Sequence, residues 1–161
     1  MKPSVAILMG SDSDAESLKG CGEVLRLFGV PFTAKVLSAH RTPEDTVAFV
    51  KSAKKEGVRV FICAAGGAAH LAGVVAAYTE LPVIGIPIET SSLKGLDSLL
   101  STVQMPAGTP VATVAIGAGG VRNAAFLAAR ILALSDEKLE KALADYKETN
   151  RKKILGKKVE L

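Results

Sequence analysis

Short apolar runs alternate with segments of helical spacing along this chain, and this alternation limits the possible fold more than any other feature. The runs lie at 4–9, 33–37, 59–64, 82–86 and 111–116, and glycine or turn residues follow them. The segments between them carry apolar residues at helical intervals, as Val47, Val50 and Ala53 do. Five strands alternating with helices predict an α/β fold, a parallel sheet with helices on both faces. The continuous apolar character of the runs agrees, because strands buried on both faces have no polar side.

Two helix boundaries are marked in the sequence. Thr42-Pro43 precedes two acidic residues, which predicts a helix with Thr42 as its cap and Pro43 at its first position. Near the C-terminus, Leu139, Leu143 and Tyr146 share one side of a further amphipathic helix, expected over about 136–155. We therefore expect a single catalytic domain over 1–161 that ends in an extra C-terminal helix.

Composition and charge exclude several function classes. The net charge is +4, and the basic residues near the C-terminus are mixed with acidic ones, without the aromatic residues of a nucleic-acid surface. There is no apolar stretch that could span a bilayer and no signal segment, so we expect a cytoplasmic protein with no membrane or nucleic-acid partner. Cys21 and Cys63 lie in no metal-ligand spacing. Because this spacing gives no metal-ligand set, no metal is expected. Dinucleotide and P-loop fingerprints are absent, so no cofactor is expected either.

The unusual residues of the chain follow the predicted strands. The segments 10–14, 38–43, 65–70 and 117–120 come after the first, second, third and fifth runs. In an open parallel sheet these segments lie at the carboxyl ends of the strands, along the edge where ligands bind. Both histidines, His40 and His70, belong to this edge. The sequence therefore predicts a binding site there.

The first segment is suited to a phosphorylated ligand. The hydroxyls of Ser11 and Ser13, with backbone N–H groups at a strand-to-helix turn, could hold a phosphate. The carboxylate of Asp14 could accept hydrogen bonds from ribose hydroxyls. The alternative is helix capping by Ser13 or Asp12.

The second segment carries the strongest catalytic candidate. His40 could give and take a proton near neutral pH, although a single loop histidine can instead serve only as a structural hydrogen-bonding group. Arg41 beside it could clamp a phosphate, or form a surface ion pair with Glu44 or Asp45.

The third and fifth segments are rich in small residues. Small side chains before His70 let the backbone approach a ligand, and His70 could orient the pocket or cap the following helix. The segment Gly117–Gly120 is only weakly similar to a phosphate-binding turn, and a tight strand-to-helix connection explains it better.

These segments together resemble the aminoimidazole ribonucleotide carboxylase/mutase family. The resemblance rests on GSDSD at 10–14, SAHRTP at 38–43, AGGAAHL at 65–71, LPVIGIP at 81–87, DSLLSTVQMP at 97–106 and PVATVAIG at 110–117. It covers residues 4 to 135 and implies a flavodoxin-like three-layer domain with a five-stranded parallel sheet, assembled as a homo-octamer with shared sites. Ala15 departs from a Trp that is frequent in the family, and Ala72 departs from a common Pro.

The resemblance also implies roles for individual residues. His40 matches the catalytic acid–base of the family, and Arg41 matches a ribonucleotide-binding position. The implied substrate-binding residues are Ser11, Ser13, Asp14, Ser38, Ala39, Arg41, Gly66, Gly67, Ala68, His70 and Leu71.

One class of the family rearranges N5-carboxyaminoimidazole ribonucleotide to its 4-carboxy isomer, and the other carboxylates aminoimidazole ribonucleotide with carbon dioxide. The loop at 66–70 is similar to that of the first class, the mutases of purine biosynthesis. We expect this isomerase activity, with a decarboxylation, a trapped carbon dioxide and a new bond at C4. The direct carboxylase is the alternative enzyme, and a flavodoxin-like module that only holds a phosphorylated metabolite is the alternative without catalysis.

Overall fold

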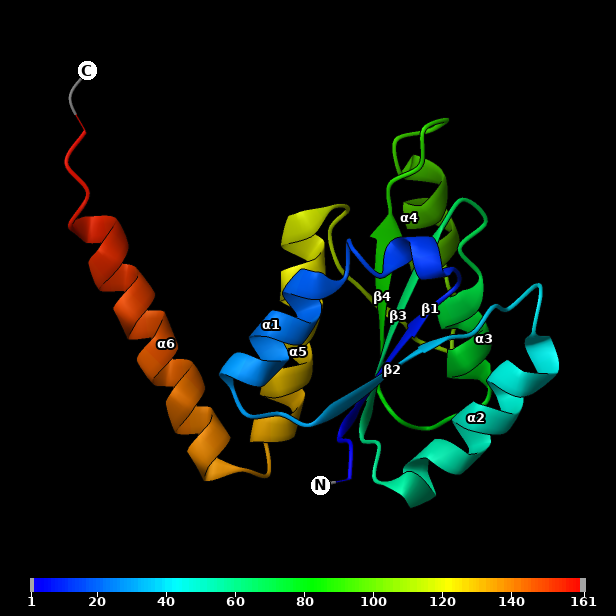
Figure 1. The fold of residues 1–161 in the computed structure, drawn as a ribbon, viewed down its shortest axis with the longest axis horizontal. Coiled ribbons are helices and arrows are strands. Elements are labelled where there is room, and N and C mark those ends of the chain that lie inside the picture. Colours follow the sequence, from blue (N-terminus) through cyan, green and yellow to red (C-terminus); the bar gives the residue numbers. More distant parts are fainter. Residues whose placement is uncertain (1, 160–161) are drawn as a thin grey trace.

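The computed structural model describes residues 2–159 and places five parallel strands in one sheet (Figure 1). The order of the strands in the sheet is β2-β1-β3-β4-β5. This order is that of flavodoxin-like doubly wound sheets, so the predicted fold class is confirmed. The strands are β1 (Val5–Met9), β2 (Phe32–Val36), β3 (Val60–Gly66), β4 (Val83–Ile88) and β5 (Ala112–Thr113).

Helices cover both faces of the sheet and make three layers. Side chains of α1 and α5 pack on one face, whereas α2, α3 and α4 lie on the other (Figure 1). A short 3-10 helix, η1, follows β1. The helices are η1 (Asp12–Asp14), α1 (Lys19–Leu27), α2 (Pro43–Glu56), α3 (Leu71–Ala77), α4 (Leu96–Val103), α5 (Ala118–Ala133) and α6 (Glu137–Leu155).

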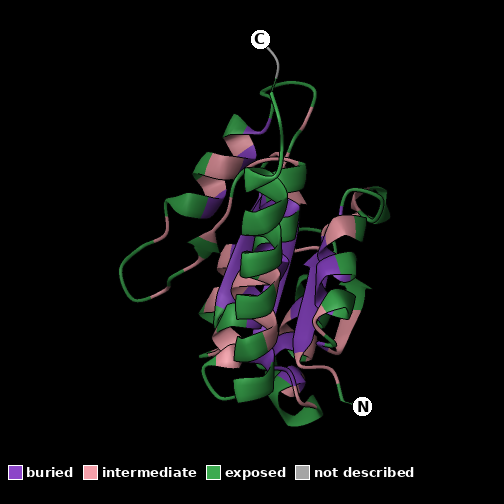
Figure 2. Ribbon diagram, turned by 90° about the vertical axis from the view of Figure 1, so that its left-hand side faces the viewer, coloured by how far each residue is buried: buried purple, intermediate pink, exposed green. Residues whose placement is uncertain are grey.

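Alternating side chains of the central strands fill two hydrophobic cores. Ile7 of β1 and Ile62 of β3 point toward α1 and α5, whereas Leu8 and Phe61 point toward α2 and α3. β1 is buried throughout and β3 is buried over its first five residues (Figure 2), which is why their sequences show no polar alternation. The buried face of α5 consists largely of alanines, and these small side chains let the helix lie close to the sheet and to α1.

The two edge strands differ from their sequence-based predictions. The run at 111–116 predicts a strand of that length, but β5 pairs with β4 only over Ala112 and Thr113. The last residues of β2 are exposed, so β2 is not buried on both faces. An edge strand has a hydrogen-bonding neighbour on one side only, so its length and burial are less strongly determined by its apolar residues.

The C-terminal helix leaves the body of the molecule. Asp136 caps α6, because its carboxylate accepts hydrogen bonds from the N–H groups of Lys138 and Leu139 at 3.1 Å. Leu139 is the one residue of α6 that is buried within the described chain, and the residues from Lys147 to Leu155 are all exposed. Tyr146 packs edge-on against Phe28, so the first half of α6 is attached, and the second half diverges from the body (Figure 1).

Among residues 2–159, the helices are all too short or too polar to cross a bilayer.

Candidate active site

A cleft of about 390 Å³ opens at the carboxyl ends of the first three strands. The loops after β1, β2 and β3 all contribute to it, as the strand-end segments predict. Of the predicted site residues, only Ser13 and Gly67 do not line this cleft in the described chain. The lining residues are Gly10, Ser11, Asp14, Ser38, Ala39, His40, Arg41, Ala65, Gly66, Ala68, His70, Leu71 and Thr90.

The loop after β1 is held by the hydroxyl of Ser11. This oxygen accepts hydrogen bonds from the Ser13 N–H at 3.3 Å and from the Ser13 hydroxyl at 2.9 Å. Ser11 is therefore the cap of η1, and the expectation that Ser13 or Asp12 caps the helix is wrong. Ser13 is bonded to Ser11 and does not line the cleft, so it supports the loop that carries Ser11.

Asp14 lies half-buried at the floor of the same loop. Burial raises the pKa of its carboxyl group above the usual range. A hydrogen bond within the loop from Ser11 and the positive charge of Arg41 oppose this shift without cancelling it. A carboxylate that has lost part of its hydration gains more than an exposed one from hydroxyl donors on a ligand.

The loop after β2 is closed by Ser38 and Thr42. The Thr42 hydroxyl accepts a hydrogen bond from the Ser38 N–H at 2.9 Å, and it makes no side-chain cap bond to α2. Thr42 is the N-cap residue of α2 and Pro43 begins the helix, as predicted, but the Thr42 side chain does not make the capping bond. The Ser38 hydroxyl accepts from the N–H groups of His40 and Arg41 at 3.4 Å and 3.1 Å, which fixes the two functional residues on one tight turn.

Arg41 joins the first two loops. Its Nη2 donates a hydrogen bond to the carbonyl oxygen of Gly10 at 2.5 Å. The alternative ion pair with Glu44 or Asp45 is not among the salt bridges of the described residues. A guanidinium has five N–H donors, so this bond leaves others to face an anion in the cleft.

The two histidines meet across the cleft. His40 Nε2 and His70 Nδ1 lie 2.7 Å apart, and the two rings are nearly perpendicular, at 81°. This distance is that of a hydrogen bond, in which one ring donates its N–H and the other accepts. His70 is the N-cap residue of α3, but its side chain makes no capping bond, so the side chain does not cap the helix.

The loop after β3 brings its backbone to the cleft. Gly67 has a φ of 63°, a conformation that favours glycine, and a Cβ on Gly66 would lie 2.9 Å from the Cγ2 of Thr90. Within the described residues, the N–H groups of Gly67 and Ala68 donate to no protein acceptor, whereas the Ala69 N–H donates to the Ser101 hydroxyl at 3.1 Å. Of these two residues Ala68 lines the cleft, so its unpaired amide remains for a ligand, whereas Gly67 lies outside the described lining.

Sequence reasoning missed Thr90 and Ser101. Thr90 follows β4 at the same edge as the other loops, so the strand-end rule alone could have included it. Ser101 is a residue of α4, and its contact with the loop after β3 depends on how α4 packs. The sequence carries no local signal for that contact.

The two thiols have no part in this site. Both cysteines are buried, and burial raises the pKa of Cys21 to about 12. Burial also raises the pKa of Cys63. Thiols that stay protonated are poor nucleophiles and poor metal ligands. Among the described residues, no three His, Cys, Asp or Glu side chains are grouped as metal ligands would be.

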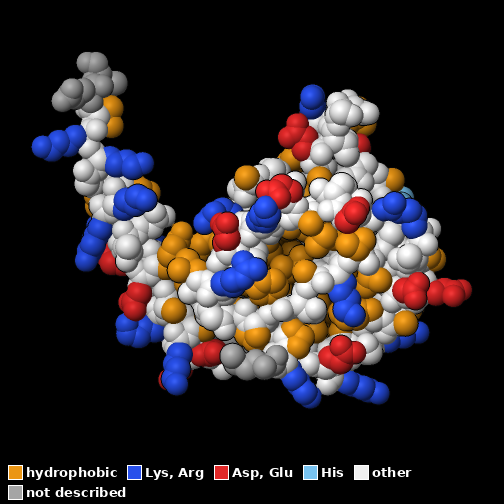
Figure 3. Space-filling view, in the orientation of Figure 1, with side chains coloured by type: hydrophobic (Ala, Val, Ile, Leu, Met, Phe, Trp, Pro, Cys, Tyr) orange, Lys and Arg blue, Asp and Glu red, His pale blue; other side chains and the backbone are white. Residues whose placement is uncertain are grey.

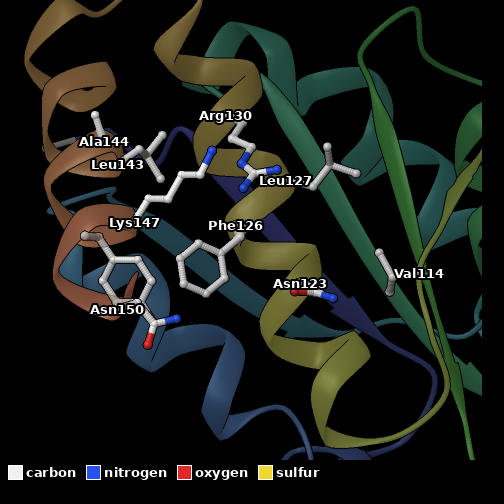
Figure 4. A pocket seen from close by; sticks show the side chains of 10 residues that line it. Val114, Asn123, Phe126, Leu127, Arg130, Leu143, Ala144, Lys147 and Asn150 are labelled. Atoms are coloured by element: carbon white, nitrogen blue, oxygen red, sulfur yellow. The ribbon is translucent and has the colours of Figure 1, made fainter. Parts of the chain in front are cut away.

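A larger groove of about 710 Å³ lies between α5 and α6, and none of the described residues lining the smaller cleft contributes to it (Figure 4). Phe126 and Leu127 of α5 and Leu143 of α6 line it, and Arg130 and Lys147 reach into it. Its described lining includes none of the residues predicted to bind substrate. We assign the chemistry to the smaller cleft, because both imidazoles, the Arg41 guanidinium and the unpaired amide of Ala68 gather there.

Comparisons with known proteins show what the whole chain is similar to. The model of the family "AIR carboxylase" matches residues 4–153. An N5-carboxyaminoimidazole ribonucleotide mutase of Brucella melitensis is 51% identical, with 96% of this chain and 95% of that protein covered. A mutase of the same name from Saccharolobus solfataricus is 51% identical over 98% of this chain and 99% of its own length. The crystal structure of Treponema denticola PurE superposes with a TM-score of 0.85 at 32% identity, covering 95% of this chain and 94% of that one.

Proposed function

This chain belongs to the AIR carboxylase family, and we propose that it is an isomerase of purine biosynthesis acting in the cytoplasm. Its substrate would be N5-carboxyaminoimidazole ribonucleotide, and its product the 4-carboxy isomer. The observation that carries the proposal is the cleft itself, which His40 and Arg41 line together with Gly66 and Ala68, and the amide of Ala68 is unpaired within the described chain.

The phosphate and ribose of the substrate would occupy the first two loops. Arg41 is held against Gly10 in the free protein, so little side-chain entropy is lost when its other donors meet a phosphate. Ser11 lines the same part of the cleft, and Asp14 offers acceptors to the ribose hydroxyls. These contacts place the aminoimidazole ring toward His40 and the glycine loop.

The reaction would begin with cleavage of the bond between the exocyclic nitrogen and its carboxyl group. The electron pair stays on nitrogen, which takes a proton from His40, and carbon dioxide is released into the cleft. C4 of the ring is an enamine carbon and attacks the carbon dioxide, and His40 then removes the C4 proton. The proton given in the first step is thus recovered in the second, so no cofactor is consumed.

The unpaired N–H group of Ala68, which lines the cleft, would hold the carboxyl group between the two steps. Retention of carbon dioxide beside C4 makes the second step effectively unimolecular, and this can contribute several kcal/mol to catalysis.

We expect a carboxyl label to remain with the substrate during turnover. The experiment supplies N5-carboxyaminoimidazole ribonucleotide, labelled in its carboxyl group, to the protein in excess unlabelled bicarbonate. Retention of the label in the 4-carboxy product supports the isomerase with trapped carbon dioxide. Turnover of aminoimidazole ribonucleotide with free carbon dioxide, and none of the labelled substrate, would identify the direct carboxylase. If the protein bound these ribonucleotides but converted neither of them, it would be a module that only holds a phosphorylated metabolite.

We propose further that the protein is a homo-oligomer, an octamer in solution. Its surface carries large apolar side chains that a monomer leaves in water, among them Leu96 and Leu100 of α4, 53% and 50% exposed, and Leu155 of α6, 70% exposed. Hydrophobic side chains also gather beside the base of α6 and across the middle of the face in Figure 3. The diverging half of α6 and the groove of Figure 4 would be covered by a neighbouring copy.

Sedimentation velocity at micromolar concentration checks the assembly. We expect a single species of about eight times the 16.7 kDa chain mass. A monomer of that chain mass would contradict the proposal without affecting the assignment of the cleft.

A further inference from the structure

The contact between His40 and His70 leaves only one imidazole nitrogen of His40 for a substrate. Nε2 of His40 is held at 2.7 Å from Nδ1 of His70. An imidazole has two nitrogens, so the one that remains to meet a substrate is Nδ1.

We propose that His70 is a positioning residue that acts through His40, fixing its ring so that Nδ1 exchanges the proton with the substrate. This inference rests on the proposed isomerase, and it replaces direct substrate binding as the main role of His70. The side chain of His70 has no other hydrogen-bonding partner within the described residues, which agrees with a role directed at His40.

The proton count of the pair explains why such a contact is useful. In the neutral pair, one proton bridges the two rings, from His40 Nε2 to His70 Nδ1, and His40 Nδ1 carries an electron pair ready to act as a base. Addition of one proton to Nδ1 gives a pair with a single positive charge, which the bridging hydrogen bond shares between the rings. Two facing N–H groups at 2.7 Å would repel, so a second positive charge would break the contact.

The pair would therefore alternate between two states that differ by one proton at His40 Nδ1. In the first step this proton goes to the exocyclic nitrogen of the substrate as its bond to the carboxyl group breaks. In the second step the C4 proton returns to Nδ1 and restores the charged pair. Because the bridging hydrogen bond is kept in both states, the His40 ring has no need to turn between the steps.

Three substitutions of His70 separate this role from others. His70→Leu removes the partner of His40, and we expect kcat to fall about 10- to 100-fold, as when other groups that orient a histidine are removed. KM should change little. His70→Asn places an amide oxygen near the position of Nδ1 and should recover most of kcat. His70→Gln places its amide near the position of Nε2, so it is the matched control and should recover little.

A spectroscopic measurement makes the test independent of turnover. The protein has two histidines, so His70→Leu leaves His40 as the only one and its ring nitrogens are assigned directly. With 15N-labelled histidine, we expect the wild-type His40 to show one dominant tautomer with a hydrogen-bonded Nε2, and the variant to show a mixture. Unchanged His40 shifts in His70→Leu would overturn the proposal even if the protein proved not to be an isomerase.

Steady-state kinetics of the His70 variants provides a second way to overturn the proposed positioning role of His70. A rise in KM with unchanged kcat in His70→Leu would show that His70 binds substrate directly. Equal recovery by His70→Asn and His70→Gln would also overturn it, because only one of them reaches the Nδ1 position. Melting curves of all three variants confirm that each is folded before rates are compared.

Discussion

His40→Asn strongly lowers turnover and leaves ribonucleotide binding nearly intact. General acid–base catalysis by a placed side chain contributes about 100- to 10 000-fold, so we expect kcat to fall by that factor. Asparagine cannot exchange a proton near neutral pH, and the contacts proposed for the phosphate do not involve the His40 side chain. The loop should keep its shape, because the Ser38 hydroxyl accepts from backbone N–H groups at positions 40 and 41, which the substitution retains. Single-turnover rates and calorimetric titration with aminoimidazole ribonucleotide measure the two effects.

Arg41→Ala is the complementary variant, because it should weaken binding of the ribonucleotide and leave the acid–base residue His40 in place. Loss of charge-assisted hydrogen bonds to phosphate costs about 1.5–3 kcal/mol each, which predicts a Kd at least about tenfold higher. Turnover at saturating substrate should fall much less than in His40→Asn.

A different result for His40→Asn would contradict the proposal. If this variant lost affinity and kept its rate per bound complex, His40 would be a binding residue and the proposed chemistry would need another acid–base.

The central part of the fold can be predicted from the sequence because burial determines it. β1, β3 and β4 are surrounded by side chains on both faces, so their runs are continuously apolar and their positions follow from the apolar pattern alone. The edges are predicted less well. β5 is much shorter than its apolar run. Two residues after β5 the backbone of Ala115 lies against Gly120 of α5, and the apolar pattern of the sequence does not indicate this contact.

The site shows the same division between local and tertiary information. The rule that parallel strands end at one edge is enough to bring together residues of three loops, including both histidines, from their positions in the sequence. The rule cannot give side-chain directions. The 2.7 Å contact between His40 and His70, and the turn of the Ser13 hydroxyl toward Ser11, depend on rotamers that only the packed molecule fixes. Ser101 escapes prediction for the same reason.

Gly120→Ala strongly destabilises the protein. A Cβ at this position would overlap the carbonyl oxygen of Ala115 and lie 2.5 Å from its carbonyl carbon. Both atoms belong to the backbone, so no side-chain rotation relieves the overlap, and α5 must move away from the strand connection. Overpacking typically costs about 1–3 kcal/mol even where side chains can adjust, so we expect a loss of at least about 3 kcal/mol in the free energy of unfolding. Thermal melting at equal protein concentration measures this.

Gly119→Ala is the matched control, one residue away in the same helix. A Cβ at Gly119 has no neighbour within 4 Å, and alanine in a helix is favoured over glycine by about 0.5–1 kcal/mol, so this variant should be as stable as the wild type or more so.

Comparison of the two glycine variants also decides the role of the glycine-rich segment at 117–120. Equal melting temperatures for the two variants, with weaker ribonucleotide binding in Gly120→Ala, would make the segment a phosphate-binding turn. Loss of stability in Gly120→Ala alone assigns it to packing, since a turn that only contacted phosphate would tolerate a methyl group in the free protein.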